Sequence, residues 1–82
     1  MGQWDKLVEK ILAMNKNVRF EELDKAMCRM GYTVSQPKGG SSHYIYRKAG
    51  CMPITIPKHQ PMGRAYIEMV AEIVRQYLKE DE

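Results

Sequence analysis

The sequence predicts a two-layer α+β domain, in which a three-stranded antiparallel sheet is covered on one face by helices. Apolar residues recur at helical spacing over residues 3–30 and again over 64–78. Residues 32–57 instead alternate between apolar and polar or form short apolar runs bounded by Gly and Pro. Strands joined by such tight turns must pair antiparallel, because parallel pairing requires a long crossover. Helices packed on one face of that sheet give the α+β class.

Two amphipathic helices are expected before the strands. The first runs from Gln3 to Met14, and its apolar positions are Trp4, Leu7, Val8, Ile11 and Leu12. The second runs from about Phe20 to Met30, and its apolar stripe comprises Phe20, Leu23, Met27 and Met30. Carboxylates in its first turns suit the positive end of the helix dipole. Gly31 follows at the position where a left-handed residue commonly ends a helix.

Three strands and a final helix complete the predicted order. The strands are expected at Tyr32–Gln36, Ser42–Lys48 and Pro53–Pro57, separated by turns rich in Gly, Ser or Pro. Prolines at both ends of the third strand cannot donate hydrogen bonds to a ladder. The last helix is expected from about Arg64 to Leu78, where apolar residues again follow a helical period.

The second strand carries the candidate functional residues. His43 and Arg47 share one of its faces, and Tyr44 and Tyr46 share the other. We expect the tyrosines to face the helices and His43 with Arg47 to lie on the open face of the sheet. Ile45 falls on that open face too, which opposes this assignment.

The basic residues are concentrated in the middle of the chain. No carboxylate side chain occurs between Asp24 and Glu68, although the net charge of the whole chain is only +3. The cations in this segment are Lys25, Arg29, Lys38, Arg47, Lys48, Lys58 and Arg64. Such a segment predicts a positive surface, for which nucleic acid is the commonest large anionic partner. A solvated basic loop with an incidental histidine is the alternative interpretation.

The bulk composition favours one small cytoplasmic domain. The 82 residues contain no apolar run near the roughly 20 residues that span a bilayer, and the N-terminus lacks a secretory signal. Cys28 and Cys51 are far from any CxxC or metal-ligand spacing. We expect Cys28 to be a small core residue on a helix and Cys51 to be a loop thiol.

Two segments resemble the HicA toxins of bacterial type II toxin–antitoxin systems, namely GSSHYIYR at 40–47 and PITIPKH at 53–59. The resemblance covers about Val18 to Leu78, and its most specific motif is Gly-Ser-His opening the second strand. Ser41 stands where many members have Gly, and the two glycines are displaced one step back. Residues 1–17 add an accessory helix that minimal members lack, so we expect a HicA-like domain over 18–82.

The resemblance implies a double-stranded-RNA-binding-like α-β-β-β-α fold and a metal-independent endoribonuclease that cleaves mRNA. His43 would be the catalytic general acid or base. It further implies a cognate HicB-type antitoxin protein that holds the enzyme inactive. We expect this partner to place carboxylates opposite Lys38, Arg47 and Lys58, with the apolar residues of the first helix as a second anchor.

The residue types suit RNA cleavage, which needs proton carriers and cations around the phosphate. Candidate RNA-binding residues are Lys38, Gly39, Gly40, Ser42, Arg47, Lys58 and His59. His59 is either a second proton carrier or a surface loop residue. The sequence offers neither paired carboxylates nor a Cys/His ligand set, so we expect no metal and no small-molecule cofactor.

Two other classes of function stay open. One is a non-catalytic module of the same fold that binds double-stranded RNA by shape. His43 separates it from the nuclease, because a module that only binds RNA needs no titrating group there. The other is a small adaptor that uses the Trp4-Leu7-Ile11 helix for protein contact, which leaves the basic segment unexplained.

Overall fold

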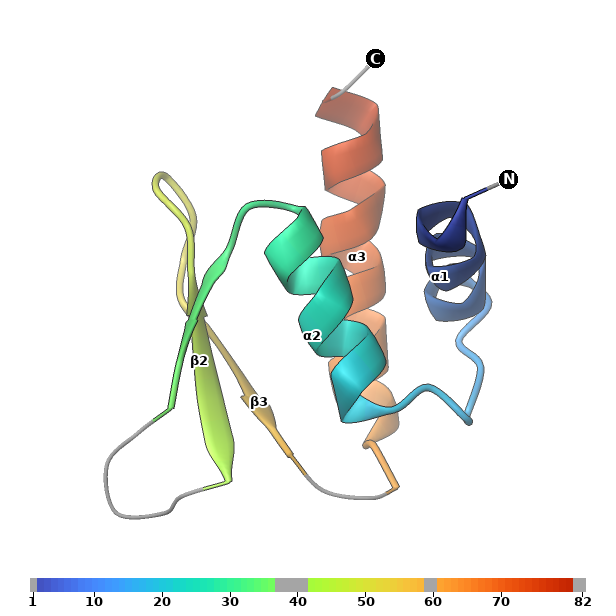
Figure 1. The fold of residues 1–82 in the computed structure, drawn as a ribbon, viewed down its shortest axis with the longest axis horizontal. Coiled ribbons are helices and arrows are strands. Elements are labelled where there is room, and N and C mark those ends of the chain that lie inside the picture. Colours follow the sequence, from blue (N-terminus) through green and yellow to red (C-terminus); the bar gives the residue numbers. More distant parts are fainter. Residues whose placement is uncertain (1, 37–41, 59–60, 81–82) are drawn as a thin grey trace.

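The computed structural model describes residues 2–36, 42–58 and 61–80, and its architecture is α+β, as the sequence predicts (Figure 1). The helices are α1 (Gln3–Leu12), α2 (Phe20–Arg29) and α3 (Arg64–Glu80). The strands are β1 (Thr33–Ser35), β2 (His43–Arg47) and β3 (Ile54–Pro57). All of the predicted elements are therefore present in the predicted order.

The three strands form one antiparallel sheet with β2 in the centre. β1 pairs with β2 through Thr33 opposite Arg47 and Ser35 opposite Ile45. β3 pairs along the other edge of β2. β1 has three residues, fewer than the sequence predicts, because its pairing with β2 runs only from Thr33 to Ser35. Tyr32 precedes the ladder and lies buried in the core.

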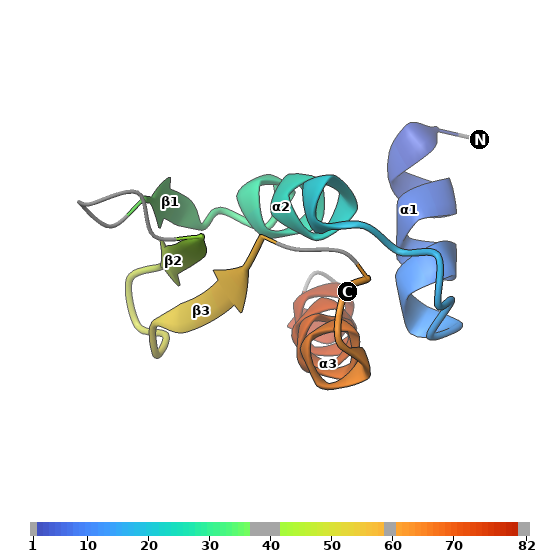
Figure 2. The same cartoon turned by 90° about the horizontal axis from the view of Figure 1, so that it is seen from below.

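The helices do not all touch the sheet. α2 and α3 lie on the same side of it, whereas α1 packs against α3 and α2 on the side remote from the strands (Figures 1 and 2). The prediction that helices cover one face of the sheet is thus correct for α2 and α3. α1 instead forms a further layer behind them.

The apolar face of α1 belongs to the same core as the rest of the protein. Ile11 is fully buried there, together with Leu23 of α2, Val70 of α3 and Tyr46 of β2. Ile11 is therefore not available to a partner, whereas Trp4, Leu7, Val8 and Leu12 pack against the core and stay partly exposed. An adaptor role for α1 stays a prediction, with Ile11 excluded from its contact surface. The division of the chain at residue 18 stays a prediction.

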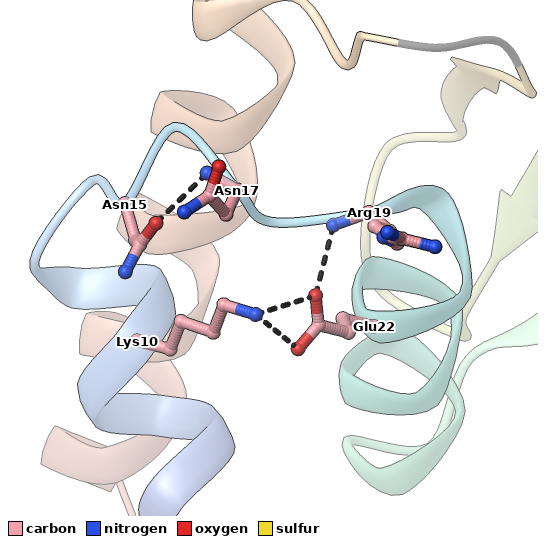
Figure 3. A network of polar contacts seen from close by, with 5 residues as sticks. All are labelled: Lys10, Asn15, Asn17, Arg19 and Glu22. Atoms are coloured by element: carbon pink, nitrogen blue, oxygen red, sulfur yellow. Dashed lines mark hydrogen bonds and ion pairs between the residues drawn. The ribbon is translucent and has the colours of Figure 1, made fainter.

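Polar contacts tie α1 to the start of α2 (Figure 3). The Glu22 carboxylate accepts hydrogen bonds from the Lys10 ammonium at 2.9 and 3.0 Å and from the Arg19 backbone N–H at 2.9 Å. The hydrogen bond from the Arg19 N–H satisfies a backbone donor that would otherwise be unpaired before the first turn of α2. Glu22 therefore caps α2 and holds α1 beside it.

Cys28 is exposed, so its predicted place in the core is wrong. The buried stripe of α2 follows Leu23, Ala26, Met27 and Met30. Successive residues of an α-helix are turned by about 100°, which carries Cys28 away from that stripe. Cys51 is exposed in the turn after β2, as expected. No helix of the described residues is long and apolar enough to cross a membrane.

Candidate nucleic-acid interface

The two faces of β2 are divided as the alternation of its side chains predicts. Tyr46 is fully buried on the helix side, and Tyr44 packs against the core. His43 and Arg47 are exposed on the open face. Ile45 is half-buried on that face, where its neighbours across the ladder are Ser35 and Thr55. The two flanking strands therefore cover part of the Ile45 side chain, although no helix packs on this face.

A partly buried hydrogen bond fixes β2 against α2. The Tyr46 hydroxyl donates to the Asp24 carboxylate at 2.7 Å. Burial and this hydrogen bond both raise the pKa of Tyr46 well above its ordinary value, so the phenol stays protonated and acts as a donor. On the same face, the Tyr44 ring lies 4.9 Å from the Phe20 ring, with a 49° angle between their planes. These contacts set the position of the strand that carries His43.

His43, Ser42 and Lys58 lie at the same end of the sheet. His43 is the first residue of β2 and stands opposite Pro57, the last residue of β3. The Lys58 backbone N–H donates to the Ser42 carbonyl oxygen at 2.7 Å, which continues the pairing beyond the strands. The Lys58 ammonium lies 5.9 Å from the centroid of the Phe20 ring. Because the Phe20 ring also contacts Tyr44, the Lys58 ammonium lies on the helix side of the sheet, whereas His43 is on the open face. The two residues share one end of the sheet but not one face.

Arg47 occupies the other end of β2. It lies four positions after His43, which corresponds to about 13 Å along a strand. Its partner across the ladder is Thr33 of β1. Arg47 and His43 share a face but lie at opposite ends of the strand. Arg47 therefore suits a different phosphate of the same ligand.

Several predicted site residues fall outside the described part of the chain. They are Lys38, Gly39, Gly40 and His59, together with Ser41 of the motif. They flank Ser42 or Lys58 in the sequence, and their roles stay predictions.

The basic segment does not form a single surface in the described residues. Lys48 lies over the rings of Tyr32 and Tyr77, at 5.6 and 5.5 Å from their centroids. Lys25 and Arg29 line a groove between α1 and α2. The basic segment between Asp24 and Glu68 passes through five of the six helices and strands, so its cations lie on different sides of the protein. The sequence gives no signal of this separation, since it depends on packing.

The described residues at the His43 end combine a possible proton carrier with a cation. They contain no group of three His, Cys, Asp or Glu side chains placed to hold a metal ion. Comparisons with protein-family models, with curated proteins and with solved structures find no match to this chain. The interpretation of the site therefore depends on its own chemistry and on the motif around His43.

Proposed function

We propose that this protein is the toxin of a bacterial type II toxin–antitoxin system, with a double-stranded-RNA-binding-like fold of the HicA type. In this proposal it is a cytoplasmic endoribonuclease that cleaves mRNA without a metal ion. The observation that carries the proposal is the exposed His43 at the end of the central strand, with Lys58 at the same end. The segment Gly40-Ser41-Ser42-His43, which resembles the Gly-Ser-His motif of the HicA family, supports it from the sequence.

RNA supplies its own nucleophile in the 2′-hydroxyl group. A base takes the proton of this hydroxyl, the 2′-oxygen forms a bond to phosphorus, and the bond from phosphorus to the 5′-oxygen breaks. The leaving oxygen then takes up a proton. A histidine is suited to either transfer, because its unperturbed pKa lies near neutrality. The Lys58 ammonium is suited to stabilising the negative charge that develops on the phosphate oxygens.

The antitoxin partner in this proposal is an acidic-faced protein of the HicB type. It covers the open face of the sheet with carboxylates opposite Arg47 and reaches Lys58 around the His43 end of the sheet, and this charge complementarity would also speed association at low salt. The predicted second anchor on α1 is not part of the proposal, because Ile11 is buried in the core.

The decisive experiment is cleavage of mRNA by purified His43→Ala protein. We expect the rate to fall by about 10²–10⁴-fold, the usual contribution of general acid–base catalysis. RNA affinity and the circular dichroism spectrum should stay near those of the wild type. Gln76→Ala, an exposed change on α3, is the matched control and should cleave normally.

Two results would contradict the proposal. Cleavage by His43→Ala at the wild-type rate removes the enzymatic role of this residue. RNA binding without any cleavage by the wild type favours the non-catalytic RNA-binding module instead. Cleavage should also persist in excess EDTA, and activity that disappears with EDTA and returns with magnesium would refute the metal-free mechanism.

A further inference from the structure

A groove between α1 and α2 has the composition of an anion-binding site. α1 contributes Gln3, Trp4, Lys6, Leu7 and Lys10, and α2 contributes Glu22, Lys25 and Arg29. The groove has a volume of about 450 Å³, which lies within the range of small-molecule binding sites. Its lining residues carry four cationic side chains and one carboxylate. They recur at helical spacing on both helices, so each helix directs one stripe into the groove.

The two helices run antiparallel, and this arrangement gives the groove two different ends. At one end Lys10 and Glu22 form an ion pair at 2.9 Å (Figure 3). At the other end the Arg29 guanidinium lies 5.7 Å from the centroid of the Trp4 ring. Lys10 lies six positions after Trp4, which corresponds to about 9 Å along a helix. The space between the two ends therefore matches a single nucleotide better than a longer ligand.

Lys6 and Lys25 occupy the part between these ends. Both are exposed, and neither has a carboxylate partner among the described residues. The lone carboxylate of the groove is already paired with Lys10. Two like charges on facing helices repel each other, and a bound anion removes that cost. A phosphate group is an anion that lysines bind as point charges.

The Trp4 end supplies the second half of a nucleotide site. The Trp4 ring is half-buried and packs edge-on against Tyr77, with centroids 6.4 Å apart and an angle of 89° between the planes. An indole ring and a planar guanidinium are both protein groups on which nucleic-acid bases stack. An acidic peptide would use the lysines but would leave this aromatic end without a matching group.

We propose that the groove binds a nucleotide, with its phosphate between Lys6 and Lys25 and its base against Trp4 and Arg29. The site is separate from the open face of the sheet, since α1 lies behind α2 and α3 (Figure 2). The inference goes beyond the proposed ribonuclease activity and does not depend on it. The nucleotide is either free or one unit of a single strand, and the experiment below distinguishes these sources.

Trp4 is the single tryptophan of the chain, so its fluorescence reports directly on the groove. We would titrate the full-length protein with AMP, adenosine, inorganic phosphate and a hexanucleotide of deoxyadenosine. The deoxy strand lacks the 2′-hydroxyl and cannot undergo the proposed cleavage. AMP should quench Trp4 saturably and bind more tightly than adenosine or phosphate. A hexanucleotide that binds at least tenfold more tightly than AMP identifies a strand as the source, and equal affinities identify the free nucleotide.

Removing the charges of Lys6 and Lys25 tests whether these side chains bind the phosphate group. The variant Lys6→Gln/Lys25→Gln should bind AMP roughly tenfold more weakly, the loss expected for two solvent-exposed ionic contacts. Lys16→Gln/Arg75→Gln removes the same charge outside the groove and should bind as the wild type does. His43→Ala should also bind normally, which separates this test from that of the ribonuclease.

Three outcomes would overturn the proposal. They are the absence of saturable quenching by AMP and by the hexanucleotide, wild-type affinity in Lys6→Gln/Lys25→Gln, and binding of hexaglutamate as tightly as the hexanucleotide. The last result would make the groove a docking site for acidic protein segments. Both double variants change exposed side chains, and matching thermal melts would show that they fold.

Discussion

Tyr46→Phe is the substitution for which the structure gives the clearest expected magnitude. The Tyr46 side chain is fully buried, and its hydroxyl donates to the Asp24 carboxylate at 2.7 Å. Phenylalanine keeps the aromatic ring and its packing in the core. The change therefore removes one hydrogen bond and leaves a half-buried carboxylate without its phenol donor.

A hydrogen bond to a charged group contributes about 1.5–3 kcal/mol to stability. Asp24 is half-buried, so water partly replaces the lost donor, and we expect a loss of about 1.5–2 kcal/mol. Unfolding entropy is about 2.1 cal/mol/K per residue, or roughly 0.17 kcal/mol/K for 82 residues. The expected decrease in Tm is therefore about 10 °C.

Thermal and urea unfolding of four proteins would measure this effect: the wild type, Tyr46→Phe, Asp24→Asn and the double variant. The coupling free energy between the two sites should be about 1 kcal/mol or more. Tyr66→Phe is the control, because this half-buried tyrosine makes no side-chain hydrogen bond among the described residues. A Tm decrease of less than about 3 °C, or additive effects in the double variant, would refute the assigned role of this hydrogen bond.

The raised pKa of Tyr46 adds a dependence on pH. A group whose pKa is higher in the folded state stabilises the protein below its unfolded pKa and loses that contribution as the pH rises. The ordinary value for tyrosine is 10, so the wild type should lose stability above pH 10. The difference between the wild type and Tyr46→Phe should shrink over the same range. A constant difference up to pH 11 would contradict this linkage.

Three further outcomes are expected. Ile11→Ala should lower the free energy of unfolding by about 2–4 kcal/mol, because the side chain is fully buried; a loss below about 1 kcal/mol would make α1 dispensable to the core. Lys10 and the Arg19 N–H lower the pKa of Glu22 despite its partial burial, so this carboxylate stabilises the fold above its ordinary pKa of 4.5. Lys10→Met should reduce the loss of stability as the pH falls below that value, and identical acid unfolding curves would contradict this. Lys58→Gln should slow RNA cleavage more than Arg47→Gln, since only Lys58 lies at the His43 end; equal rates would argue against this geometry.

The sequence predicted the elements well wherever it contained a stop signal. α2 ends at Arg29, and Gly31 follows with a φ of 98°, the left-handed conformation that favours glycine. α1 ends two residues earlier than predicted, and Met14 beyond it has a φ of 57°. Methionine gives no sequence signal for that conformation. α3 extends to Glu80 because the residues after Leu78 are good helix formers without a cap.

The candidate site was predictable only where it depends on local geometry. The alternation of β2 correctly assigned Tyr44 and Tyr46 to the helix side and His43 and Arg47 to the open face. Which cations lie together was not predictable, because that depends on the register of the strands and on the packing of α1.

α2 connects the two candidate surfaces, and different residues of this helix serve each of them. Asp24 holds β2 and therefore the strand that begins with His43. Glu22 holds α1, while Lys25 lines the groove. Loosening the Asp24 contact should therefore disturb the His43 surface before it disturbs the groove, whereas loosening the Glu22 contact should do the reverse. A variant that weakens both surfaces equally would place the damage in the shared core, because the buried stripe of α2 supports β2 and α1 alike.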